Sequence, residues 1–110
     1  MHVRTKTRLT LANLVIAASI ERAGDRTVAE QVLRVQWVEV PGMPGVGLDN
    51  EGAHCAVGPG WVEGTTDAEL RYALLFVWAK WKTMHAEKVA AEQQFACAAV
   101  ENARGRNALN

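Results

Sequence analysis

Cysteine and long apolar runs are scarce in this chain of 110 residues, and each shortage excludes a class of protein. Cys55 and Cys97 are the two cysteines, too few for a disulfide framework, which favours free thiols over a single bridge. The apolar runs "LTLANLVIAASI" and "YALLFVWA" are too short to span a bilayer. We therefore expect a globular, cytoplasmic protein.

Basic residues are missing from the middle of the chain. No Lys or Arg lies between Val35 and Leu70, a stretch that holds six carboxylates, although the whole chain is neutral with 12 basic and 12 acidic residues. Zero net charge argues against nucleic-acid binding. The acidic stretch is either a solvated loop or a surface for a cationic partner, and in the second case Asp49, Glu51 and Glu63 bind that partner.

The N-terminal residues 1–8 alternate in polarity. In an extended basic arm, His2, Arg4, Lys6 and Arg8 would share one face and could lie along phosphates, although such arms are commonly frayed. The arm and the apolar run after it imitate a signal peptide, but Asn13 interrupts the run and no cleavage motif follows. A structural helix is the better interpretation.

Two helices are predicted in the region 9–38, which resembles a helical hairpin. Apolar spacing predicts a helix over 9–23, ended by Gly24. The motif "TVAE", Thr27 to Glu30, fits a capping box and predicts a second helix starting there. The β-branched run that follows predicts helix to about Gln36 and extended chain to Val40.

The region 39–65 is acidic and rich in glycine and proline, which predicts a loop. Within it, Ala53–Val57 and Trp61–Glu63 could pair as a small hairpin.

The same loop carries residue types that bind metals, namely Asp49, Glu51, His54 and Cys55. Their spacing matches no zinc or calcium signature, so we expect no metal and no cofactor. Cys55 with His54 or His85 could form a nucleophile and base, but no motif supplies an orienting group or an oxyanion hole. An enzyme is therefore the less favoured class.

One long helix is predicted over 66–104, followed by a tail at 105–110. "TDAE", Thr66 to Glu69, is a second capping box, and no Gly or Pro follows until Gly105. Apolar residues form two stripes along this helix, more than a core of this size can cover, so a partner chain is implied. The predicted oligomer interface comprises Leu74, Val77, Trp81, Met84 and Phe95.

Aromatic residues offer an alternative to protein contact. Trp78, Trp81 and His85 share a side of the long helix, and with Trp61 they could wall a pocket for a flat, nucleotide-like ligand.

The expected fold over 1–110 is a single mainly α domain, with α+β possible: short N-terminal helices, a Gly-rich loop or small β-hairpin, and a long C-terminal helix. The expected function is that of a small oligomeric adaptor or inhibitor, of the kind found among bacterial or phage accessory proteins. Its partners would be itself and another protein, with no membrane or nucleic acid. A small-ligand binder is the alternative.

Overall fold

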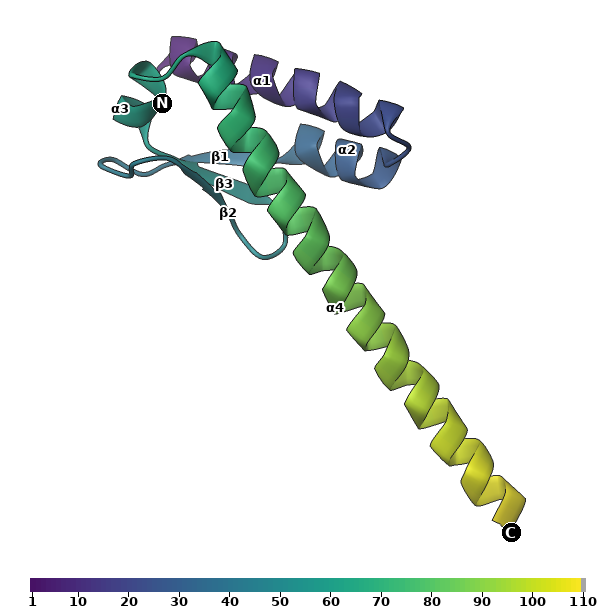
Figure 1. Cartoon of the computed structure of the whole chain (residues 1–110). Helices are drawn as coiled ribbons and strands as arrows, with labels where there is room; N and C mark the ends of the chain where they lie inside the picture. The colour runs from purple at the N-terminus through teal and green to yellow at the C-terminus, as the bar shows by residue number, and fades with distance from the viewer. Residues whose placement is uncertain (110) are drawn as a thin grey trace.

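The computed structural model describes the backbone of residues 1–109 and the side chains of residues 1–94. Residues 1–66, which precede the last helix, form a small head. The head packs around the first half of that helix, and the rest of the helix projects away from it (Figure 1). The radius of gyration, 19.0 Å, exceeds the roughly 13 Å of a compact chain of this length, and the longest dimension is 68 Å. The molecule is therefore elongated because of one helix.

The elements confirm the predicted mainly α class with a small β component. In chain order they are α1 (Val3–Arg22), α2 (Arg26–Arg34), β1 (Gln36–Glu39), β2 (Val46–Leu48), β3 (His54–Val57), α3 (Pro59–Glu63) and α4 (Asp67–Leu109).

The extended N-terminal arm is a wrong prediction, because α1 already begins at Val3. The imidazole Nδ1 of His2 caps the helix by accepting a hydrogen bond from the backbone N–H of Arg4, over 3.2 Å. Thr5 and Leu9 are buried in the head, so the first turns are held by packing. The helix predicted over 9–23 is present within this longer one.

The turn between α1 and α2 differs from the predicted one in its capping residue. Gly24 has a positive φ of 92°, as expected of the residue that ends α1. The carboxylate of Asp25 accepts from the N–H of Val28, so Asp25 caps α2 and Thr27 lies inside the first turn. The predicted change from helix to extended chain is confirmed, but it comes earlier, after Arg34.

The glycine-rich middle is not one loop. Its strands form a three-stranded sheet in the order β1-β3-β2, with β3 parallel to β1 and antiparallel to β2. The predicted pairing of Ala53–Val57 with Trp61–Glu63 is wrong, because Pro59 opens α3, which contains Trp61. Proline suits the first turn of a helix, where its missing N–H costs nothing.

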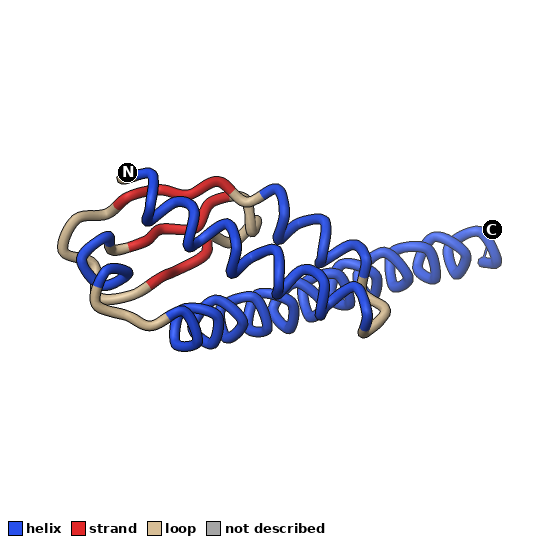
Figure 2. The backbone as a smooth tube through the Cα atoms, turned by 90° about the horizontal axis from the view of Figure 1, so that it is seen from above, coloured by secondary structure: helices blue, strands red, loops and turns tan. Residues whose placement is uncertain are grey.

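The helices α1 and α4 cross one face of the sheet, whereas α2 lies beyond the end of the strands (Figure 2). Cys55 and Val57 of β3 are fully buried on that face, whereas His54 is exposed, as the alternation of a strand requires. Leu74 and Trp78 of α4 complete the core beside them.

The second capping box is confirmed at the start of α4. The Thr66 hydroxyl accepts from the N–H of Glu69, over 3.2 Å, and donates to the Glu69 carboxylate, over 2.9 Å. The predicted end is wrong, since α4 runs through Gly105 to Leu109 and leaves no separate tail over 105–109. One glycine costs a helix only about 1 kcal/mol, which does not stop it.

Candidate functional site

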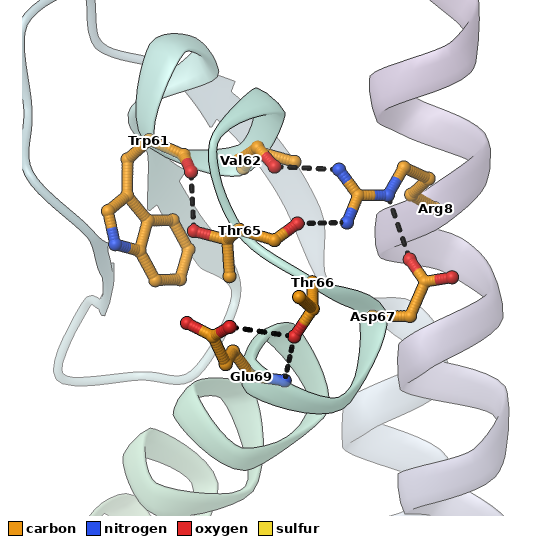
Figure 3. Close-up of polar contacts among 7 residues, drawn as sticks. All are labelled: Arg8, Trp61, Val62, Thr65, Thr66, Asp67 and Glu69. Carbon is orange, nitrogen blue, oxygen red and sulfur yellow. Dashed lines mark hydrogen bonds and ion pairs between the residues drawn. The ribbon is translucent and has the colours of Figure 1, made fainter.

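Three contacts fix the first half of α4 to the head, and the first comes from Arg8 (Figure 3). Its guanidinium donates to the carbonyls of Val62 and Thr65, over 2.6 and 2.5 Å, and to the carboxylate of Asp67, over 2.9 Å. The side chain is only 21% exposed. Arg8 therefore joins α1 to the connection between α3 and α4, and it is not available as a phosphate ligand of a free arm.

The second contact is made by Trp81 at the turn between β2 and β3. Its indole N–H donates to the carbonyl of Asn50, over 3.0 Å, and its ring lies against Gly52. Trp78, buried beneath, meets the Trp81 ring edge-to-face at 5.6 Å, and His85 stacks on it at 4.9 Å. Trp81 therefore joins α4 to the turn at the end of the sheet.

The third contact lies at the turn between α1 and α2. The ammonium of Lys82 and the carboxylate of Asp25 form an ion pair of 2.8 Å. The hydrogen bond from Lys82 lowers the pKa of Asp25, and the bond from the Val28 N–H acts in the same direction.

Beyond these contacts α4 leaves the head. Every side chain from Lys82 to Gln94 is exposed. From Ala86 to Leu109 the helix extends for roughly 35 Å at 1.5 Å per residue.

An open apolar groove of about 730 Å³ lies between β2 and the first half of α4. Tyr72, Phe76 and Met84 line it and are 74%, 61% and 50% exposed. Its other walls are formed by the Pro44–Asn50 segment and by Trp61, Ala73, Val77, Lys80 and Trp81. Large apolar side chains exposed together in this way are typical of a contact surface.

The structure brings together only part of the predicted ligand pocket. Trp61 and Trp81 line the groove, but Trp78 is 1% exposed inside the head. His85 stacks on Trp81 outside the groove lining.

The residues of the predicted oligomer interface also differ in their exposure. Leu74 is fully buried in its own head, so it cannot lie at an interface, and Val77 and Trp81 pack partly against the core. Met84 is free at the surface, and the side chain of Phe95 lies outside the described residues. The reason is that the head packs against the side of α4 that carries Leu74 and Trp78.

The three acidic residues predicted to bind a partner do not form one patch. Asp49 and Glu51 precede β3, and Glu63 follows it at the end of α3, so they lie at opposite ends of the strand. The carboxylate of Asp49 also has hydrogen-bond partners within the protein. It accepts from the backbone N–H groups of Ala53 and His54 and contacts the His54 ring at 2.9 Å. The bond with His54 lowers the pKa of Asp49.

The loop residues that resemble metal ligands are separated by the strand. His54 and Cys55 point to opposite faces of β3, and no cluster of three metal-ligand side chains occurs among residues whose side chains are described. Burial raises the pKa of the Cys55 thiol to about 12, so it is not a nucleophilic thiolate near neutral pH. Cys97 lies outside the described side chains.

Comparison with protein-family models, curated proteins and solved structures finds no match to this chain. None of the helices in the described part of the chain has the length and apolar character needed to cross a membrane.

Sequence reasoning missed the residues that the groove exposes, Tyr72, Phe76 and Lys80. They recur every four residues with Met84, a spacing that puts them on one side of a helix. This spacing is a signal of a shared helix face, but the interface prediction follows the two apolar stripes instead.

Proposed function

We propose that this protein is a small interaction protein that self-associates through α4 and presents its head to another protein. One observation carries the proposal: α4 leaves the head after Lys82, and every side chain from Lys82 to Gln94 is exposed. An isolated helix of this kind is marginal in water, and helices in proteins owe most of their stability to packing. A second helix supplies that packing. The roles of adaptor or inhibitor, a bacterial or phage origin and a cytoplasmic location belong to the same proposal.

The test is the molar mass in solution of two matched variants. Phe76→Glu places a charge on the exposed groove face of α4, and Leu11→Glu places one on α1, where Leu11 is 58% exposed. Neither side chain belongs to the core, so both variants should fold. We expect light scattering to show a wild-type oligomer that Phe76→Glu dissociates and Leu11→Glu does not. Dissociation by neither variant would contradict an interface on this face of α4.

A ligand-binding function is the second candidate, because Trp61 and Trp81 do line the same groove. Its test is the quenching of tryptophan fluorescence by nucleotides and other flat anions, with Trp61→Phe as the control. The absence of saturable quenching at millimolar concentration would remove this candidate.

A further inference from the structure

We infer that the groove between β2 and α4 holds the α4 of a second copy running antiparallel, with a two-fold axis passing between Thr83 and Met84. The inference rests on the proposed self-association. It adds that the two α4 helices run antiparallel, which of their positions face each other, and that the second copy fills the groove.

The exposed face of α4 is continuous across the groove and beyond it. At 100° per residue, the positions on this face lie within an arc of about 120°. All of them are exposed: Tyr72, Phe76, Lys80, Thr83, Met84, Glu87 and Ala91. One surface therefore runs from the groove onto the projecting half of the helix.

Charge complementarity selects the orientation. Lys80 and Glu87 have no charged residue three or four positions away, and neither forms an ion pair with another described side chain. They are two turns apart, about 10 Å, too far to pair within one helix. Since they lie equally far from the point between Thr83 and Met84, an antiparallel copy places Glu87 opposite Lys80, twice by symmetry.

A parallel copy is disfavoured by the same two residues. In register, it would set Lys80 against Lys80 and Glu87 against Glu87, and like charges on facing positions repel.

Side-chain size agrees with the antiparallel register. Phe76, 61% exposed, faces Ala91 of the second copy, and a large residue against a small one lets two helices approach to the usual 8–10 Å. Tyr72 faces position 95. The groove residues of α4, from Tyr72 to Met84, therefore face positions 83 to 95 of the second copy, which lie beyond Trp81, the last half-buried residue among the described side chains of that helix.

Charge reversal tests the register. Lys80→Glu and Glu87→Lys should each replace two attractions by two repulsions and raise the dimer Kd by about tenfold. The double variant should restore the wild-type Kd, and Glu92→Lys, a charge reversal off this face, should leave it unchanged. Failure of the double variant to recover would overturn the register.

Disulfide trapping tests the orientation and separates it from self-association. In a Cys97→Ser background, Thr83→Cys should oxidise to a covalent dimer, because the two copies of position 83 lie beside the axis. Gln94→Cys should not, because its two copies would be about 30 Å apart along the helices. A covalent dimer of Gln94→Cys would show a parallel dimer, overturning this inference and leaving self-association intact. A wild-type monomer at 100 µM by light scattering would refute both.

Discussion

Trp81 packs against Gly52 at the turn between β2 and β3, and its indole N–H donates a hydrogen bond to the carbonyl of Asn50, over 3.0 Å. Gly52 has a positive φ of 68°, and a Cβ built on it would lie 2.7 Å from the indole. The turn and the helix are thus fitted to each other at the point where α4 leaves the head.

Gly52→Ala should therefore destabilise the protein by about 1–3 kcal/mol, because the new methyl group displaces Trp81 and the backbone is strained. Gly60→Ala is the control, since a Cβ there meets no atom within 4 Å. Urea unfolding measures both. Equal stability of the two variants would show that Trp81 is not closely docked.

Arg8→Ala should cost roughly 2–4 kcal/mol, because it leaves the Val62 and Thr65 carbonyls without their charged donor. Arg8→Lys should recover little of the lost stability, since an ammonium cannot reproduce the planar set of donors of a guanidinium. Arg4→Ala, an exposed change on the same helix, serves as the control for charge. A lysine variant as stable as wild type would contradict the three-way contact.

Acid should weaken the head through Asp25 and Asp49. The pKa of each is lowered in the folded protein, so their stabilisation is complete above the ordinary value of 3.8 and is lost as the pH falls through the folded pKa. Asp25→Asn keeps the helix cap and removes only the Lys82 pair, costing no more than about 1 kcal/mol at pH 7. The difference in unfolding free energy from wild type should shrink towards pH 2. A constant difference would mean that the carboxylate charge contributes nothing.

Cys55 should resist thiol reagents in the folded protein, because it is buried and its pKa is raised to about 12. In a Cys97→Ser background, labelling should be absent in buffer at pH 8 and complete in urea without prior reduction. Fast labelling in buffer would show that the sheet opens readily.

The glycine-rich middle shows why local features of the fold can be predicted from the sequence and strand pairing cannot. Local chemistry identifies Gly24 and the Thr66–Glu69 cap, because each acts on atoms a few residues away. Strand pairing is not local. β3 spans only His54–Val57, and so short a strand carries too little pattern to show which segment pairs with it. The sequence therefore predicts pairing with Trp61–Glu63, whereas β3 pairs with β1 and β2.

The candidate site was only half predictable for a similar reason. Helical periodicity shows which residues of α4 share a face, but not which face the head will cover. Leu74 is predicted at an oligomer interface and Trp78 in the wall of an alternative ligand pocket, and both lie in the core, whereas Tyr72 and Phe76, which belong to neither prediction, are exposed. Among the predicted interface residues whose side chains the structure describes, Met84 is the exposed one, at 50%.

The decisive measurement for self-association through α4 is the molar mass of the wild-type protein by light scattering, at concentrations from about 1 to about 100 µM. Self-association through α4 predicts a mass of at least twice the 12.0 kDa of the chain, rising with concentration. A mass that stays at 12.0 kDa across this range would contradict it.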